Sequence, residues 1–420
     1  MGIMSKHLLI VGGGFAGLWS ALAAAREAEI AGGGIAISLV SRDDHLTLRP
    51  RLYEQNPARF REPLRPILET VGVSLRLGSV CGIDADKRQV ALDRADAMNE
   101  WIGYDRLILA AGSAMIMPAI PGMAEHAWNI DTHTAAMALD QHLREIARTP
   151  NVSGHDTIVI VGGGFTGIEL AAEMRTRLAV HSDPVTSARA RVILIERADV
   201  VGPDLGAGPR PVIEAALTTA GVETRLGEEV TEVSADGLTL STGERIAAAT
   251  IIVTTGLRAN PLAAALPVER DELGRLPVDD FLRVAGVDGV YACGDMARAY
   301  VDESHLALMS CQHALRMGRF AGRNAACDLL SRPLQPYRQP RYVTCLDLGT
   351  SGAVFTTGWQ REVSMVGAEA KELKQSINGQ RIYPPHGERA VLLAAAEIDP
   401  PSPTPGLSIR LQAFSSTNTS

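Results

Sequence analysis

Two glycine-rich turns in the chain have a spacing suited to binding a pyrophosphate. The first follows an apolar run at 8–11 and places Gly12, Gly14 and Gly17 in G-x-G-x-x-G order. In such a turn the first glycine permits a tight bend, the second lets backbone N–H groups approach a phosphate, and the third lets the next helix pack closely. The phosphate then lies at the positive N-terminus of that helix. A single match is weak, because such a turn can be purely structural.

The second turn repeats the first almost letter for letter. Gly162, Gly164 and Gly167 follow the apolar run 157–161, so that GGGFAG becomes GGGFTG. Two near-identical fingerprints in one chain predict two nucleotides bound by two related domains. The residues inside the turns complete the expected cofactor contacts: Phe15 and Ala16 in the first, and Phe165 and Thr166 in the second.

A carboxylate is expected where the second strand of such a domain ends, because it hydrogen-bonds a ribose. Aligning ISLVSR with VILIER places Ser41 opposite Glu196. Glu196 would accept from ribose hydroxyls and repel a 2′-phosphate, which favours NADH over NADPH. The first site lacks this acid. The candidates to bind the ribose in this site are Ser41, Asp43 and Asp44, with Arg42 lying over the adenine. An equally good interpretation is that the two aspartates belong to a solvated loop.

The elements around these turns alternate between strands and helices. Each unit closes with an apolar strand that ends in a small residue and glycine, at Ala111-Gly112 and at Gly256. A later strand leads into Gly294-Asp295, and a helix over 311–330 follows, in which Gly318 and Gly322 permit close packing. The polar segment 44–54 is expected to lie near a ligand, and a proline-containing loop near residue 118 marks a crossover. The fold class predicted is therefore α/β, with two Rossmann-like dinucleotide-binding domains.

Composition narrows the function classes. The 420 residues are enough for two or three domains, and a net charge of −8 gives no reason to expect nucleic-acid binding. No secretory signal and no apolar run of spanning length are recognised, so a cytoplasmic location is expected. The five cysteines contain no C-x-x-C pair, which indicates neither zinc nor a local redox disulfide, and no metal site is predicted.

Five segments resemble, in sequence and in order, the pyridine nucleotide-disulfide oxidoreductase superfamily of flavoproteins: GGGFAG, LILAAGS, GGGFTGIELA, IIVTTGLRANPL and GVYACGDMA. The resemblance covers Leu8 to Arg323. The resemblance implies FAD on a discontinuous domain, 1–118 and 276–332, with Gly294 and Asp295 contacting its ribitol and pyrophosphate. It implies NAD(P)H on a domain spanning 119–275. Residues 333–420 would form a C-terminal interface region whose tail is disordered from about 402.

Within this superfamily the chain is most similar to type II NADH:quinone oxidoreductases, through Glu169 after the second fingerprint, GLRANPL and HLTLRPRLYE. The resemblance implies hydride transfer from NADH to flavin and then to a quinone. Glu169 would order the hydride donor or relay a proton; the alternative is a surface carboxylate paired to an arginine. The family's A-Q-x-A-x-Q-Q stretch aligns with 311–317 and keeps only Gln312 and Ala314. Gln312, with His313 and Arg316, is expected to border the acceptor site, although His313 also reads as a buried, hydrogen-bonded histidine.

Other functions remain open at this point. A sulfide:quinone oxidoreductase or disulfide reductase needs paired cysteines by the flavin, and none lies between Cys81 and Cys293. The weak quinone stretch and the lack of an apolar-faced docking helix leave a soluble NAD(P)H-dependent flavin reductase, acting on a small molecule or an electron-carrier protein. A low-turnover flavin redox sensor is a further alternative. Membrane association is expected to be peripheral at most, at the inner face, and a homodimer is one of the oligomeric states left open.

Overall fold

The first glycine fingerprint lies at the carboxyl end of the central strand of a five-stranded parallel sheet. The computed structural model describes residues 6–94, 97–148, 154–179 and 190–399, so the tail expected from about residue 402 lies outside the described part. The strands of this sheet, in spatial order, are β20 (Val290–Ala292), β9 (Arg106–Leu109), β1 (Lys6–Val11), β2 (Ile35–Ser41) and β5 (Ser74–Leu77). Because the sheet is covered on both faces, β1 is a continuous apolar run rather than an alternating one.

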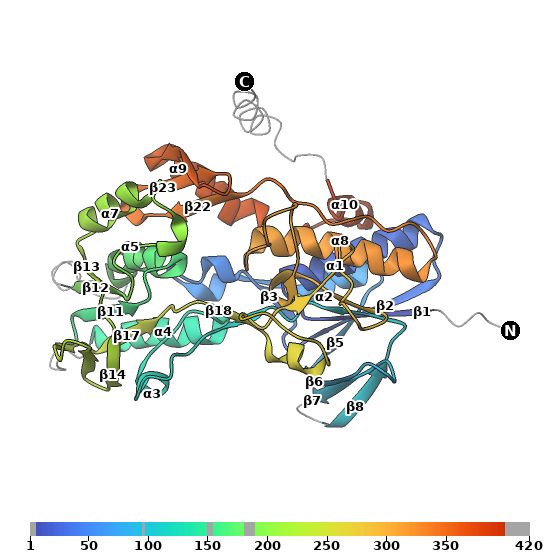
Figure 1. Cartoon of the computed structure of the whole chain (residues 1–420), viewed down its shortest axis with the longest axis horizontal. Coiled ribbons are helices and arrows are strands. Elements are labelled where there is room, and N and C mark those ends of the chain that lie inside the picture. The colour runs from blue at the N-terminus through green and yellow to red at the C-terminus, as the bar shows by residue number, and fades with distance from the viewer. Residues whose placement is uncertain (1–5, 95–96, 149–153, 180–189, 400–420) are drawn as a thin grey trace.

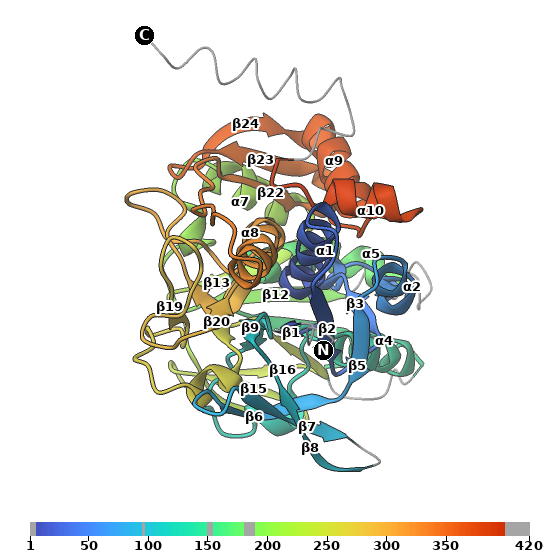
Figure 2. The same ribbon diagram turned by 90° about the vertical axis from the view of Figure 1, so that its right-hand side faces the viewer.

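Helices α1 (Phe15–Ile30) and α8 (Cys311–Leu329) lie side by side on this sheet, although almost 300 residues separate their starts (Figure 2). Their close approach depends on two glycines of α8. A Cβ atom on Gly318 would lie 2.4 Å from the carbonyl oxygen of Ala16, and one on Gly322 would lie 2.0 Å from that of Ser20. The expectation that these glycines permit close packing is confirmed.

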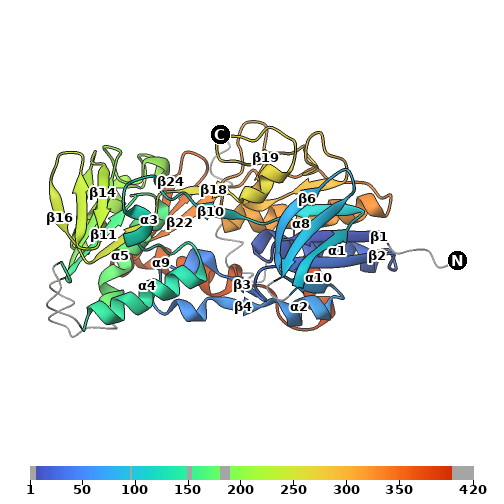
Figure 3. The same ribbon diagram turned by 90° about the horizontal axis from the view of Figure 1, so that it is seen from below.

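The second fingerprint lies in a four-stranded parallel sheet built in the same way. Its strands, in spatial order, are β13 (Val222–Leu226), β12 (Arg191–Glu196), β11 (Thr157–Val161) and β17 (Thr250–Val253). The helices of this unit are α5 (Phe165–Ala179), α4 (His133–Ile146), α7 (Arg210–Thr219) and the short α3 (Met123–His126). The predicted α/β class with two Rossmann-like sheets is thus confirmed, and the two units form the two halves seen in Figure 3.

The chain crosses between the two units on a pair of short antiparallel strands, β10 (Ser113–Met115) and β18 (Leu257–Ala259). This crossover lies where the sequence predicts one, just before Pro118. The remaining small elements flank the first sheet and decorate the second: β3 (His45–Thr47), β4 (Arg61–Pro63), α2 (Leu64–Thr70), β6 (Ser79–Asp84), β7 (Gln89–Arg94), β8 (Ala97–Gly103), β14 (Val230–Ser234), β15 (Gly237–Leu240), β16 (Arg245–Ala247), β19 (Leu276–Pro277) and β21 (Ala297–Arg298). The domain boundaries themselves stay a prediction.

The C-terminal region forms a layer above both units (Figure 1). It contains the antiparallel strands β22 (Val343–Asp347), β23 (Ala353–Thr357) and β24 (Glu362–Val366), then α9 (Gly367–Ser376), the π-turn η7 (Ile377–Arg381) and α10 (Arg389–Ala395). The sequence pattern predicts strands around Val343 and Val354 and a charged helix over 368–375, and β22, β23 and α9 agree with it. Among the described residues, no helix has both the length and the apolar character needed to cross a membrane.

Candidate active site

A cavity of about 2100 Å³ opens between the two parallel sheets and the C-terminal layer. Small-molecule sites usually measure about 300–1,000 Å³, so this cavity has room for more than one ligand. It collects nearly all the site residues predicted from the sequence: Gly12, Gly14, Phe15, Ala16, Ser41, Arg42, Ala111, Gly112, Gly162, Gly164, Phe165, Thr166, Glu169, Glu196, Gly256, Gly294, Asp295 and Gln312. The third glycine of each fingerprint, Gly17 and Gly167, does not line it.

The geometry of the first fingerprint fits a pyrophosphate. Gly12 has a φ of +118°, and a Cβ atom there would lie 2.3 Å from the carbonyl oxygen of Ala110. Gly14 faces open space, with no atom within 4 Å of where its Cβ would lie. Helix α1 begins there without a side-chain cap and without an acidic residue in its first turn, which leaves its N–H groups available to an anion. Gly17 serves packing instead, because its Cβ would lie 1.7 Å from the carbonyl oxygen of Gly12.

The second fingerprint adds a carboxylate. The backbone N–H of Gly163 donates to Glu196 Oε2 at 2.7 Å, and the N–H of Ala198 donates to Glu196 Oε1 at 2.9 Å. Ser41 occupies the matching position in the first unit, since Gly12 bonds Val40 and Gly162 bonds Ile195 in the same way. The two sites therefore differ as the alignment predicts, with a hydroxyl in one and an acid in the other.

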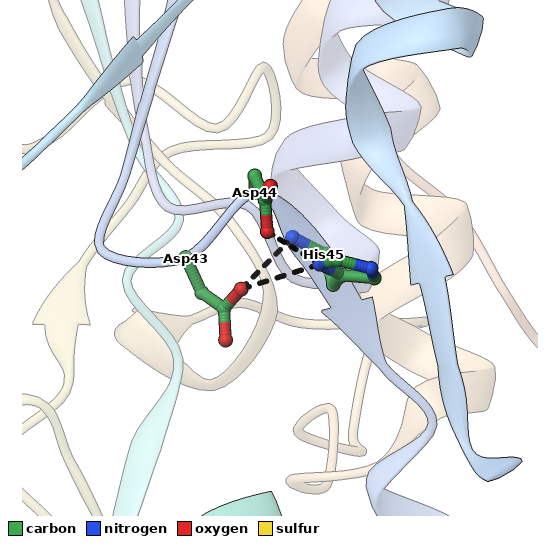
Figure 4. A group of neighbouring side chains, drawn as sticks. All are labelled: Asp43, Asp44 and His45. Atoms are coloured by element: carbon green, nitrogen blue, oxygen red, sulfur yellow. Dashed lines mark hydrogen bonds and ion pairs between the residues drawn. The ribbon is translucent and has the colours of Figure 1, made fainter. Parts of the chain in front are cut away.

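The loop after Ser41 gathers Asp43, Asp44 and His45, shown in Figure 4. His45 Nδ1 contacts a carboxylate of each aspartate, and Arg61 pairs with Asp43. Roughly half of each aspartate side chain is exposed, and the arginine already neutralises one of them. We therefore assign no metal to this cluster. The roles suggested for Asp43 and Asp44 at a ribose stay predictions.

The Gly294-Asp295 turn closes the cavity beside the start of α1. Gly294 has a φ of +64°, and a Cβ there would lie 2.8 Å from the Ala16 methyl group. Ser113 Oγ donates to Asp295 Oδ2 at 2.6 Å, and burial raises the pKa of this carboxyl. Cys293, directly before the turn, is fully buried and contacts Ser20 Oγ at 3.5 Å, as expected of a small filler.

Glu169 lies on α5 and reaches the cavity from a buried position. Its Oε1 accepts from Lys374 Nζ at 2.7 Å and from the backbone N–H of Asp347 at 2.9 Å. Burial raises the pKa of Glu169 to about 7, and the charge of Lys374 opposes this rise. The alternative of a surface carboxylate paired to an arginine is therefore wrong: the group is buried, and its partner is a lysine from α9.

Lys374 is the functional candidate that sequence reasoning missed. Its ammonium is buried, lines the cavity and also donates to the carbonyl oxygen of Cys345 at 3.0 Å. It lies 205 residues after Glu169 in the chain and belongs to no motif. The feature of the sequence that could have identified Lys374 is its position four residues after Ala370. This spacing puts it on the buried face of a short helix that is otherwise charged.

A hydrogen-bonded network extends from this pair to the segment 44–54. Tyr53, which lines the cavity, donates its hydroxyl to Asp347 Oδ2 at 3.0 Å, and Lys371 pairs with the same carboxylate. Burial raises the pKa of Tyr53 well above its usual value. The network joins the N-terminal unit, α5 and the C-terminal layer, and segment 44–54 lines the cavity as the sequence suggests.

The start of α8 gives a mixed outcome. Gln312 lines the cavity and donates from Nε2 to the carbonyl oxygen of Val343 at 3.2 Å. His313 is fully buried outside the cavity lining, with Nδ1 3.0 Å from Ser310 Oγ, which supports the second interpretation of this histidine. Arg316 does not border the cavity. Its guanidinium donates to the carbonyl oxygen of Arg338 at 2.9 Å and pairs with Asp399 at 2.8 Å, so its expected place at an acceptor site is wrong.

Comparisons with known proteins agree with this architecture. The family model described as pyridine nucleotide-disulphide oxidoreductase matches residues 6–318. An NADH dehydrogenase-like protein of Mycobacterium tuberculosis is 48% identical over 397 residues, covering 93% of this chain and 98% of that protein. The type II NADH:quinone oxidoreductase of the same organism is 30% identical over 323 residues, covering 69% and 67%. The structure of NDH2 from Plasmodium falciparum in complex with NADH superposes with a TM-score of 0.75 at 14% identity, covering 90% and 95%, which shows a shared fold.

Proposed function

We propose that this chain, which belongs to the pyridine nucleotide-disulphide oxidoreductase family, oxidises NADH and passes the electrons through bound FAD to a quinone. The observation that carries the proposal is that one cavity is lined by both glycine fingerprints, which we call the two phosphate cradles, and by Glu169. Two relatives support the choice of substrates, because one is named an NADH dehydrogenase-like protein and the other a type II NADH:quinone oxidoreductase. Bound FAD would supply the hydride acceptor and release the electrons to the quinone.

In this proposal each of the two cradles binds a different nucleotide. The first fits FAD because Gly12 and Gly14 open the N-terminus of α1 to a pyrophosphate, and Gly294-Asp295, in the turn after β20, closes the same pocket. The second fits NADH, because Glu196 lies where a ribose hydroxyl would be bound. The same carboxylate would repel the 2′-phosphate of NADPH, so NADH is the preferred donor in this proposal.

Glu169 is well suited to handle a proton in this reaction. Reduction of a quinone by NADH consumes one proton beyond the hydride, since NADH, H⁺ and quinone give NAD⁺ and hydroquinone. With a pKa of about 7, Glu169 can hold and release that proton near neutral pH. Lys374 donates a hydrogen bond to Glu169 Oε1 and would fix the orientation of the carboxyl group. The lysine would stay charged while Glu169 binds and releases the proton.

The test is an acceptor survey on the purified protein. We expect one FAD per chain on denaturation, loss of the flavin absorbance when NADH is added without oxygen, and its return on adding a quinone. Dioxygen, ferricyanide and an iron–sulfur protein complete the panel. A protein that takes up no flavin would contradict the cofactor, and rapid reduction by NADH with reoxidation by every acceptor except quinones would contradict the quinone.

A further inference from the structure

Beyond Gln312, the cavity ends against the C-terminal layer in a pocket that we call the acceptor end. Its walls come from the start of α8, from β22 and from the turn η7, segments that are drawn in orange and red in Figure 1. Much of this wall is apolar: Leu308, Met309, Leu315, Val343, Ile377 and Ile382. An apolar pocket of this kind suits a flat organic ring.

Two arginines interrupt this apolar wall. Arg361 and Arg381 both line the cavity, and neither forms an ion pair with a carboxylate among the residues that the structure describes. The remaining cations nearby are already balanced, because Lys374 pairs with Glu169, and Lys371 pairs with Asp347 and Glu173. The acceptor end therefore carries a local excess of positive charge, although the whole chain has a net charge of −8.

The neighbours of Arg361 hold it in place. Its guanidinium lies 5.3 Å from the centre of the Tyr342 ring, which is a cation–π contact. Tyr342 in turn stacks on Trp359 at 4.5 Å, and Trp359 stacks on His305 at 4.4 Å. Arg361 belongs to the turn between β23 and β24, and this aromatic column holds the Tyr342 ring that its guanidinium contacts.

Arg381 is the last residue of η7, which directly follows α9, the helix that carries Lys374. Burial raises the pKa of the Cys345 thiol to about 12, and the positive charges of Lys374 and Arg381 both oppose that rise. Burial also lowers the pKa of Arg381 itself. The Arg381 side chain nevertheless stays exposed to solvent, and a cation without a carboxylate partner gains from binding an anion.

Resting on the proposed function, we infer that the acceptor is an anionic quinone, a flat ring that carries a carboxylate, sulfonate or phosphate group bound by Arg361 and Arg381. Overall, NADH, H⁺ and the quinone give NAD⁺ and the hydroquinone: the hydride of NADH supplies both electrons and one hydrogen, one proton supplies the other hydrogen, and the anionic group is unchanged. Charge attraction in a partly desolvated cavity is stronger than in water. The arginines thus select the acceptor by its charge.

Two quinones of similar size test this inference: naphthoquinone sulfonate, which is anionic, and menadione, which is neutral. The ratio of their kcat/KM values is measured with NADH in excess, for the wild type, Arg361→Gln, Arg381→Gln and the double variant. We expect the double variant to lose at least about 10-fold more kcat/KM on the sulfonate than on menadione. Rising salt should lower the wild-type preference for the sulfonate. Arg338→Gln, which removes an exposed arginine paired with Asp280 outside the cavity, should keep the wild-type ratio.

A binding measurement separates recognition from turnover. Calorimetric titration of naphthoquinone sulfonate into the oxidised holoprotein should give an affinity that falls at least about 10-fold in the double variant. If NADH reduces the bound flavin and both quinones lose kcat/KM equally in the double variant, the inference is wrong while the proposed function stands. If NADH leaves the flavin oxidised, the proposed function itself fails, and the inference falls with it.

Discussion

The fold raises the pKa of Glu169 into the range that suits proton transfer near neutral pH. Burial raises its pKa from 4.5 to about 7, against the opposing charge of Lys374. Folding therefore favours the neutral form: the stabilising contribution is fully present below pH 4.5 and is lost as the pH rises through about 7. A shift of this size corresponds to about 3 kcal/mol. The same property suits the group to proton transfer and makes it a stability cost at neutral pH.

Glu169→Gln should remove this pH dependence, because the amide does not titrate. Between about pH 5 and pH 8, the free energy of unfolding of the wild type should fall relative to that of the variant by about 2–3 kcal/mol. Urea denaturation at a series of pH values measures this difference. Glu214→Gln, at an exposed position on α7, is the matched control and should run parallel to the wild type. A parallel curve for Glu169→Gln would show that the carboxyl titrates normally.

Glu196 should set the choice between the two nicotinamide nucleotides. Its carboxylate lies at the end of β12, lines the cavity and accepts from the N–H of Gly163. Removing the charge in Glu196→Gln removes the repulsion of a 2′-phosphate, so kcat/KM for NADPH relative to NADH should rise at least about 10-fold. Glu223→Gln, on the neighbouring strand β13 and outside the cavity lining, should leave the ratio unchanged. An unchanged ratio in Glu196→Gln would place the ribose elsewhere.

At the scale of elements, the sequence predicts what depends on short-range pattern. The fingerprints predict the strand–turn–helix units because glycine spacing and apolar runs act within about 20 residues. The same reasoning fails for Lys374 and Arg316, because what they contact lies far along the chain. Arg316 shares a helix face with Gln312, yet carbonyl groups near 338 and 398 capture its guanidinium. No local pattern records those contacts.

The contact between α1 and α8 should be sensitive to a single methyl group. A Cβ on Gly322 would lie 2.0 Å from the Ser20 carbonyl oxygen, so Gly322→Ala must push α8 away from α1, the helix that begins at the first fingerprint. We expect the free energy of unfolding to fall by about 2–3 kcal/mol or more. Gly379→Ala, at an exposed glycine with no atom within 4 Å of its new Cβ, should change it by less than about 1 kcal/mol. Equal effects of the two changes, measured by urea denaturation, would mean that α1 and α8 can separate without cost.

At the scale of the molecule, the candidate site is built where three parts of the chain meet. Tyr53 from the first unit, Glu169 from the second and Asp347 from the C-terminal layer are joined by direct hydrogen bonds. This is why the candidate site was only partly predictable: each fingerprint names its own cradle, whereas the wall facing them comes from a region without a motif. The acceptor end belongs to that region. Its two arginines could not be assigned to the cavity from the sequence, because only the packing of the C-terminal layer brings them there.

The distribution of cysteines over the whole molecule argues against thiol chemistry in this member of the family. All five are free, and Cys311 and Cys345 line the cavity. Burial raises the pKa of Cys311 to about 11 and that of Cys345 to about 12, so both remain neutral thiols at pH 7 and make poor nucleophiles.

We therefore expect the double variant Cys311→Ala, Cys345→Ala to keep its NADH–quinone turnover within about threefold of the wild type, with Cys81→Ala at an exposed position as the control. The measurement is steady-state NADH oxidation, with the bound FAD quantified in each variant. Loss of turnover in the double variant, with FAD still bound and the fold intact, would mean that electrons leave through a thiol. Direct transfer from the flavin to the acceptor would then be wrong.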